Sequence, residues 1–201
     1  MPTRRVVLGV VAGAVGVGAA GAAAGIGIVE RAQGMVAVVR GAGIVPLAVG
    51  DAVFVEDILR TGSDARALIV CRDGLQIAIG PATELALRRF AAAEGRLEAA
   101  FGLLRGITRL VGSLVGGESA IDLDTRTAVA SVRSTEWIVE SSAPGTAALA
   151  ITGAVSVRSL AGGVVTLRAG EGTDVAPGAA PRAPALWGEA RRRDAIARTT
   201  V

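Results

Sequence analysis

From residue 30 onward, apolar and polar side chains alternate with a period of two along most of the chain. This is the pattern of a strand that buries one face, because successive side chains of a strand point to opposite sides. The clearest run places Leu75, Ile77 and Ile79 on one face and Gln76 on the other. We expect the first three side chains to lie in a core and Gln76 to face solvent. The alternation recurs in Val36 and Val38, Leu85 and Leu87, Ile121 and Leu123, Trp137 and Val139, Leu149 and Ile151, Val155 and Val157, and Val165 and Leu167.

Turn signals separate these segments. Asp73-Gly74, between two apolar runs, is typical of a tight hairpin, because both residues tolerate a positive φ. Residues 97–115 fit either a short helix or strand-turn-strand, and Gly102, Gly106 and Gly112 favour strands. Many short strands with regular turns predict an all-β fold, a single domain of short antiparallel strands arranged as a sandwich, a barrel or a β-solenoid. No repeat is regular enough to choose among these.

The first 29 residues differ from the rest. Arg4 and Arg5 precede residues 6–29, which carry no charge. As a helix this segment would extend about 36 Å, enough for a hydrocarbon core of about 30 Å. The stretch TRRVVLG resembles a twin-arginine export signal. We expect residues 1–29 to be either a signal cleaved at an A-x-A site within residues 20–24, or a helix that anchors the protein in the inner membrane. Both alternatives place the body of the protein in the periplasm.

The C-terminal part, residues 177–201, is expected to be a linker and a short basic helix. Residues 176–184 contain three prolines, which favour an extended chain. From Pro184 onward the sequence contains good helix formers, and Gly188 weakens the expected helix. We interpret Arg191-Arg192-Arg193 as a solvated face, with anionic lipid as the alternative contact.

The amino-acid composition excludes several kinds of catalytic and metal-binding site. Aromatic residues make up only 2% of the chain, so the core must be aliphatic. All 21 basic residues are arginines and there is no histidine, which removes Ser-His and Cys-His catalytic sets and zinc sites of the Cys/His kind. Cys71 is the single cysteine and lies in an apolar run, so we expect it to be buried. Without Arg4 and Arg5, residues 30–201 hold 19 arginines and 18 acids, unlike a nucleic-acid-binding surface. We therefore expect no enzyme, no cofactor, no metal and no nucleic-acid partner.

Asp122 and Asp124 lie two residues apart and would share one face of a strand. Paired carboxylates can bind Ca²⁺ or transfer protons. Because Ca²⁺ takes about six to eight oxygen ligands and no further acids cluster nearby, we favour another interpretation, in which the charges keep an edge strand soluble.

A series of short motifs carries a family resemblance: Gly50-Asp51, Asp57, Thr61-Gly62, Arg66-Ala67, Asp73-Gly74 and Pro81-Ala82-Thr83-Glu84. With them, residues 49–90 resemble the FecR domain, the periplasmic domain named for the ferric-citrate regulator. LLRGITR (103–109), VASVRSTEWIVE (129–140), ITGAVSV (151–157) and LRAGEGTDV (167–175) resemble later segments of that family. The similarity runs from about residue 34 to residue 176, and the order and spacing of the motifs make it specific.

The resemblance implies a periplasmic or envelope module, here residues 30–176, that binds a ligand or a protein in sensing or signalling. Sigma-regulating members carry a cytoplasmic anti-sigma domain before the membrane segment. Only five residues precede residue 6 here, so we expect a stand-alone member. The alternative is a structural envelope protein that packs against other proteins or peptidoglycan without signalling. The sequence does not identify a ligand.

Four polar residues separate the strands expected at 128–132 and 137–139: Arg133, Ser134, Thr135 and Glu136. They resemble a family signature in which Ser134 replaces the usual Gly and Trp137 the usual Phe. The favoured interpretation is a tight turn or bulge, in which Arg133 bonds neighbouring carbonyls or pairs with Asp122 or Asp124. The alternative is a polar contact site for a partner.

Overall fold

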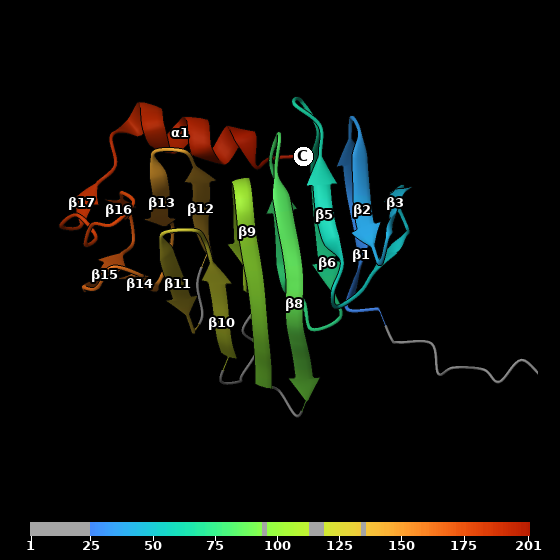
Figure 1. The fold of residues 1–201 in the computed structure, drawn as a ribbon, viewed down its shortest axis with the longest axis horizontal. Coiled ribbons are helices and arrows are strands. Elements are labelled where there is room, and N and C mark those ends of the chain that lie inside the picture. The colour runs from blue at the N-terminus through green and yellow to red at the C-terminus, as the bar shows by residue number, and fades with distance from the viewer. Residues whose placement is uncertain (1–24, 94–95, 113–118, 134–135) are drawn as a thin grey trace, which may run out of the picture.

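The computed structural model describes residues 25–93, 96–112, 119–133 and 136–201, which form a two-layer β-sandwich with one helix outside it (Figure 1). Sheet A contains, in spatial order, β4 (Ala52–Val53), β1 (Gly27–Gln33), β6 (Arg66–Cys71), β7 (Gln76–Ile79), the second part of β9 (Arg96–Val111), β12 (Glu136–Ser142), β13 (Gly145–Ala150), β16 (Glu171–Val175) and β17 (Ala185–Leu186). Sheet B contains β3 (Gly43–Pro46), β2 (Val36–Arg40), β5 (Ile58–Thr61), β8 (Glu84–Ala93), the first part of β9, β10 (Ser119–Asp124), β11 (Ala128–Val132), β14 (Ala154–Ser159) and β15 (Val164–Arg168). The all-β prediction is confirmed.

Hairpins are found in both sheets, and the last three alternate between the sheets as the chain advances along the sandwich. The hairpin β6–β7 lies in sheet A, β10–β11 in sheet B, β12–β13 in sheet A and β14–β15 in sheet B. The strand pairs are antiparallel, with the parallel pair β9–β10 as the exception. Both sheets end in edge strands, β4 and β17 in sheet A and β3 and β15 in sheet B, so the arrangement is an open sandwich. Among the three alternatives that the sequence left open, the edge strands exclude a closed barrel.

The core lies between the sheets and is aliphatic, as the composition predicts. Leu75, Ile77 and Ile79 are fully buried while Gln76 is exposed, which confirms the predicted register. The largest buried side chains are Trp137 from sheet A and Phe101 from sheet B. Burying such side chains is the main favourable contribution to folding, at roughly 25 cal/mol per Å² of apolar surface.

The β6–β7 hairpin forms where Asp73-Gly74 predicts it. Gly74 has a φ of 89°, a conformation that suits glycine because it has no Cβ. The Asp73 carboxylate accepts a hydrogen bond from the Leu75 N–H at 3.2 Å and so closes the turn. The ambiguous segment near residue 100 is likewise strand, as expected, but it is one long strand, β9, that passes from sheet B into sheet A.

The change of sheet in β9 occurs at Gly106. Leu103 pairs with β8 in sheet B, whereas Ile107 pairs with β12 in sheet A. Gly106 has a φ of 91°, and a Cβ built there would lie 2.2 Å from the Thr83 Oγ1. The corner therefore requires glycine for two reasons: the backbone conformation and the close approach of Thr83.

The folded domain begins earlier than the predicted boundary between residues 29 and 30. Gly27–Gln33 forms β1, which pairs with β4 and β6, and the side chains of Ile26 and Val29 are buried in the core. The end of the uncharged segment therefore belongs to the sandwich. Arg4, Arg5 and residues 6–24 lie outside the described residues, so the export signal or anchor stays a prediction. Among the described residues, no helix is long and apolar enough to cross a membrane.

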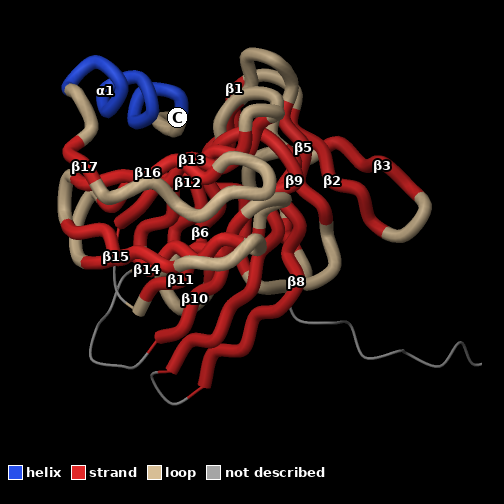
Figure 2. The backbone as a smooth tube through the Cα atoms, turned by 60° about the vertical axis from the view of Figure 1, so that its left-hand side comes forward, coloured by secondary structure: helices blue, strands red, loops and turns tan. Residues whose placement is uncertain are grey.

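The C-terminal helix is confirmed, with a later start than expected. It is α1 (Glu189–Arg198), and Gly188 is its N-cap, outside the helix. Pro184 precedes β17 instead of opening the helix. Residues 177–184 connect β16 to β17 across the end of the sandwich, where the Arg182 carbonyl accepts a hydrogen bond from Thr173 at 2.7 Å. Figure 2 shows α1 outside the strands, against sheet A.

Candidate functional site

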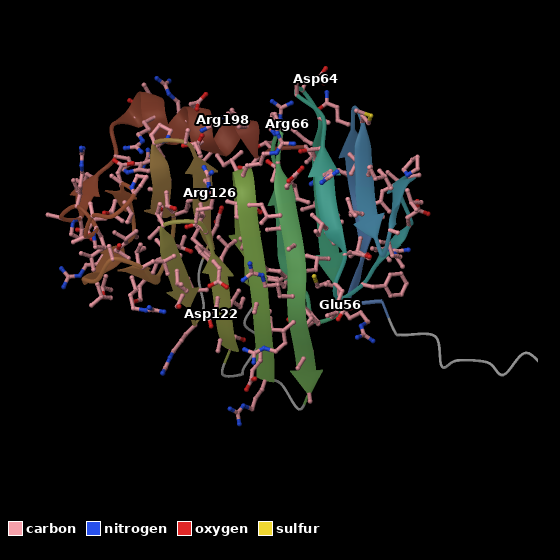
Figure 3. All side chains as sticks on the ribbon, viewed as in Figure 1. Glu56, Asp64, Arg66, Asp122, Arg126 and Arg198 are labelled. Carbon is pink, nitrogen blue, oxygen red and sulfur yellow. The ribbon has the colours of Figure 1, made fainter. Side chains whose placement is uncertain are left out.

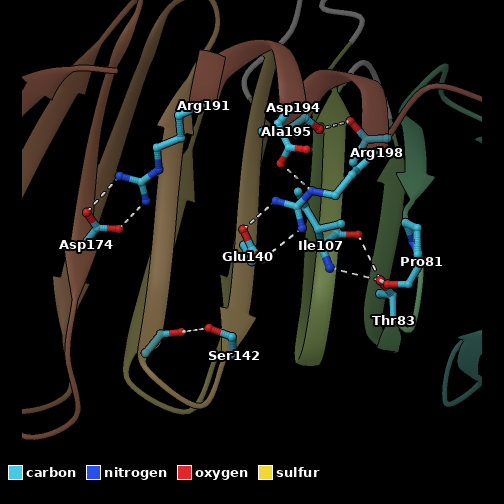
Figure 4. Close-up of polar contacts among 12 residues, drawn as sticks. Pro81, Thr83, Ile107, Glu140, Ser142, Asp174, Arg191, Asp194, Ala195 and Arg198 are labelled. Carbon is cyan, nitrogen blue, oxygen red and sulfur yellow. Dashed lines mark hydrogen bonds and ion pairs between the residues drawn. The ribbon is translucent and has the colours of Figure 1, made fainter. Parts of the chain in front are cut away.

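The residues of the family resemblance form a buried hydrogen-bond network at the β9 corner. The Thr83 Oγ1 accepts the Ile107 N–H at 3.0 Å and lies within hydrogen-bonding distance of the carbonyls of Pro81 and Ile107. The Thr61 hydroxyl donates to the Gly80 carbonyl at 2.6 Å and accepts the Thr83 N–H at 2.9 Å. Both threonines are buried, so these groups fix the corner and are not available to a ligand (Figure 4).

Two acids of the same motifs are also engaged within the fold. Asp57, 1% exposed, accepts two hydrogen bonds from the Arg40 guanidinium at 2.8 and 2.7 Å and one from the Phe54 N–H at 2.8 Å. This contact raises the pKa of Arg40 above its ordinary value, chiefly through the hydrogen bond to Asp57. Glu84 pairs with arginines of two neighbouring strands, Arg60 in β5 and Arg105 in β9. These charges stabilise the packing of β5, β8 and β9.

The predicted cluster of residues 133–136 lies where the chain crosses from β11 in sheet B to β12 in sheet A. Ser134 and Thr135 are outside the described residues. Arg133 is exposed and makes no hydrogen bond or ion pair with a described residue. Glu136 opens β12, and its carboxylate pairs with Arg109 in β9. The structure therefore ties one end of the cluster to sheet A and leaves Arg133 at the surface.

Asp122 and Asp124, the two acids considered as partners for Arg133, are engaged elsewhere. Asp122 accepts the Ser131 hydroxyl at 2.6 Å, and Asp124 pairs with Arg88 of β8. Both lie in β10, an interior strand of sheet B and not an edge strand. Within the described ranges, no group of three or more acidic or cysteine side chains is placed to hold a metal ion.

A groove of about 200 Å³ lies beside the Arg109–Glu136 pair on the outer face of sheet A. We call it the arginine groove, and its lining comes from four strands and the segment after α1: Arg31, Leu68, Gln76, Ala78, Arg109, Val111 and residues 199–201. Arg31 and Gln76 are exposed, and their side chains make no hydrogen bond or ion pair with a described residue. The Arg109 Nε is buried and unpartnered among the described residues. The groove thus offers free donors above an apolar floor.

Helix α1 covers the neighbouring part of the same face through two bidentate ion pairs. Arg191 contacts both oxygens of Asp174 in β16, and Arg198 contacts both oxygens of Glu140 in β12 at 3.0 and 2.8 Å (Figure 4). The hydrogen bonds to Glu140 raise the pKa of Arg198 above its ordinary value. Ala195 of the helix is buried in an apolar cluster with Ile107, Ile138 and Leu149 of sheet A, and Ile196 packs against this cluster. Apolar packing and the two ion pairs therefore both hold α1 in place.

The three consecutive arginines of α1, Arg191, Arg192 and Arg193, do not share one role. Arg191 is bound to Asp174 and lies 3.7 Å from the centre of the Trp187 ring, a cation–π contact. Arg193 pairs with Glu189 at 3.6 Å on the exposed side of the helix, and Arg192 is exposed. The solvated-face interpretation holds for Arg192 and Arg193. Arg191 is a docking residue, which the sequence could not indicate because Asp174 is remote in the chain.

Cys71 faces the core, as predicted. Burial raises the pKa of its thiol to about 12, so at neutral pH the thiol is protonated and out of reach of solvent.

Comparisons with known proteins agree with this geometry. Residues 57–156 match the family model described as "FecR protein". Two crystal structures of a "putative anti-sigma factor" from Parabacteroides distasonis ATCC 8503 are similar at 16% identity, with TM-scores of 0.49 and 0.50. Each match covers 59% of this chain and 54% of the other, so this chain spans about half the length of those structures. No curated protein matches the chain.

At 16% identity the likeness to these structures concerns the fold alone. The family match is independent of it and covers the stretch from Asp57 to β14, which includes the Thr61 and Thr83 network and the β9 corner. The sequence resemblance, the family match and the buried network agree, and the chain therefore belongs to the FecR-domain family.

Proposed function

We propose that this protein is a non-enzymatic signalling or sensing module of the cell envelope that binds a partner through the arginine groove. Its membership of the FecR-domain family supports a regulatory role, and the names of the similar structures point the same way. The family residues described above are used to hold the sandwich together. Recognition must therefore use side chains that the fold leaves free.

We choose the arginine groove as the binding site because the guanidinium of Arg31 is exposed and unpaired among the described residues. It lies beside the exposed amide of Gln76 and the unpartnered Nε of Arg109, above Leu68 and Ala78. Such a surface suits an acidic segment of a partner, because guanidinium groups bind carboxylates through paired hydrogen bonds. Glu136 adjoins this surface through its ion pair with Arg109, and Arg133 stays a predicted partner contact.

A charge reversal in the groove tests the proposed function. A strain that lacks the protein is complemented with the wild type, with Arg31→Glu, or with Arg89→Glu. Arg89 is an exposed arginine of β8 in sheet B, so it controls for the charge change itself. We expect the deletion to alter a defined set of transcripts, and Arg89→Glu but not Arg31→Glu to restore them at equal protein abundance. A deletion without a transcriptional effect would favour the structural envelope protein, and full restoration by Arg31→Glu would place binding elsewhere.

We also propose that the sandwich lies in the periplasm. Arg4 and Arg5 followed by an uncharged segment support this, although the segment available for export or anchoring ends before β1. A reporter that is active only after export, fused after Val201, should be active with the natural sequence. Replacing both arginines by lysine should abolish its activity if the twin-arginine route is used. Activity of a cytoplasm-dependent reporter in the unmodified fusion would contradict the location.

A further inference from the structure

Sheet B ends in an unpaired edge strand at each end of the long axis of the molecule. β3 lies at one end and β15 at the other, with β17 of sheet A close by (Figure 1). Each edge strand pairs with one neighbour among the described strands, β3 with β2 and β15 with β14. The edges carry large apolar side chains in the open: Ile44 is 63% exposed on β3, and Val164 is 62% exposed on β15. Unpaired apolar edges are sites where another strand can add.

The two ends carry opposite charge. Residues 41–59, which include β3, contain the acids Asp51, Glu56 and Asp57 and no arginine. Asp57 is neutralised by Arg40, which leaves Asp51 and Glu56 as the exposed acids of this segment. Figure 3 shows Glu56 below β5, and its N–H donates to the Leu87 carbonyl of β8. Residues 154–170, which include β14 and β15, contain Arg158 and Arg168 and no acid, and both arginines are exposed.

We propose that copies of this chain associate head to tail, with β3 of one copy added to β15 of the next. The occupant of each edge is a second copy because one molecule carries both complementary surfaces, acidic and apolar at β3, basic and apolar at β15. The surfaces lie at opposite ends, so the contact is heterologous and repeats along a row of molecules.

The edges also define which residues pair. Gly43 and Val45 bond to β2, so Ile44 and Pro46 are the residues of β3 whose backbone faces outward. Pro46 has no N–H, which leaves the Ile44 N–H and the carbonyls of Ile44 and Pro46 to bond to a neighbour. At the other edge, the outward-facing residues of β15 are Val164, Thr166 and Arg168. The Arg168 N–H donates to the Glu171 carboxylate at 2.8 Å, which leaves Val164 and Thr166. The β2–β3 hairpin projects from the body of the molecule, so the sandwich does not obstruct its edge (Figure 2).

Cysteine crosslinking of the full chain tests the association. The natural Cys71 is buried, and burial raises the pKa of its thiol to about 12. We therefore expect Cys71 to form no crosslink at pH 8. Full-length Ile44→Cys and Val164→Cys proteins are oxidised separately and as a mixture. We expect no crosslink from either protein alone, a single dimer band from the mixture, and a ladder from the double variant. Leu104→Cys, on the exposed face of an interior strand, is the control for random collision.

Charge reversal distinguishes the proposed contact from nonspecific edge pairing. Arg158→Glu with Arg168→Glu should abolish the dimer band, and pairing this protein with one that carries Asp51→Arg and Glu56→Arg should restore it. Crosslinks between two Ile44→Cys copies would overturn the head-to-tail arrangement. A mixture that crosslinks no more than the Leu104→Cys control, or a dimer band that is insensitive to both reversals, would overturn the proposal as a whole.

Discussion

The hydroxyl of Thr83 offers a direct test of the conclusion that the family motifs hold the β9 corner together. The perturbation is Thr83→Val, which keeps the shape of the side chain and removes its hydroxyl. Thr83 is 1% exposed, and its Oγ1 is the acceptor for the Ile107 N–H at 3.0 Å. After the change, that buried N–H has no acceptor, which costs about 1–3 kcal/mol. The Ile107 carbonyl is affected less, because it still accepts the Gly80 N–H at 2.9 Å.

The control is Thr83→Ser, which keeps the hydroxyl and removes one buried methyl group. Its expected cost is about 0.8 kcal/mol. Urea unfolding of the purified protein, followed through the emission of buried Trp137, measures both free energies. With a slope near 2 kcal/mol per M, the valine variant should lower the urea midpoint by about 1 M and the serine variant by about 0.4 M. A valine variant at least as stable as the serine variant would refute the structural role of the network.

Three further predictions concern other parts of the molecule. Ile77→Ala should lower the free energy of unfolding by about 2–5 kcal/mol, since it leaves a cavity in the core, while the exposed Gln76→Ala should cost less than about 0.5 kcal/mol; equal urea midpoints would contradict the register. Glu140→Gln should weaken the Arg198 contact by about 0.5–1.5 kcal/mol and speed amide exchange in α1, an effect that shrinks at high salt; unchanged exchange would mean that apolar packing holds the helix. Arg133→Ala should change the free energy of unfolding by less than about 0.5 kcal/mol, because the side chain is exposed; a loss above about 1 kcal/mol would support the structural interpretation of the turn.

The parts of the fold that the sequence predicted are those decided by neighbouring residues. The alternation around Ile77 fixed which face of β7 is buried, and Asp73-Gly74 fixed the hairpin, because both features depend on local backbone geometry. The C-terminal helix was found for the same reason, but its start was misplaced. Pro184 is compatible with a first helical turn, yet Ala185–Leu186 pairs with β16 instead.

The parts that could not be predicted depend on residues distant in the sequence. The glycines of β9 favoured strands, but one of them, Gly106, is a corner between two sheets, where Thr83 packs against it from the turn before β8. The arginine groove brings together β1, β6, β7, β9 and the segment after α1, and Arg31 has no local signal that marks it. An exposed arginine on a predicted strand is ordinary in sequence and becomes notable only when its neighbours are known.

The use of the family motifs inside the fold limits what family membership can say about the partner. Thr61, Thr83, Asp57 and Glu84 are each satisfied by groups of the same chain, so a protein can keep all of them and change what it binds. Specificity must then come from surfaces outside the network. On this chain the uncovered outer face of sheet A and the two ends of sheet B are such surfaces, and they are separate in space. A partner at the arginine groove and a second copy at β3 or β15 would therefore not compete for the same residues, and both can bind one molecule at the same time.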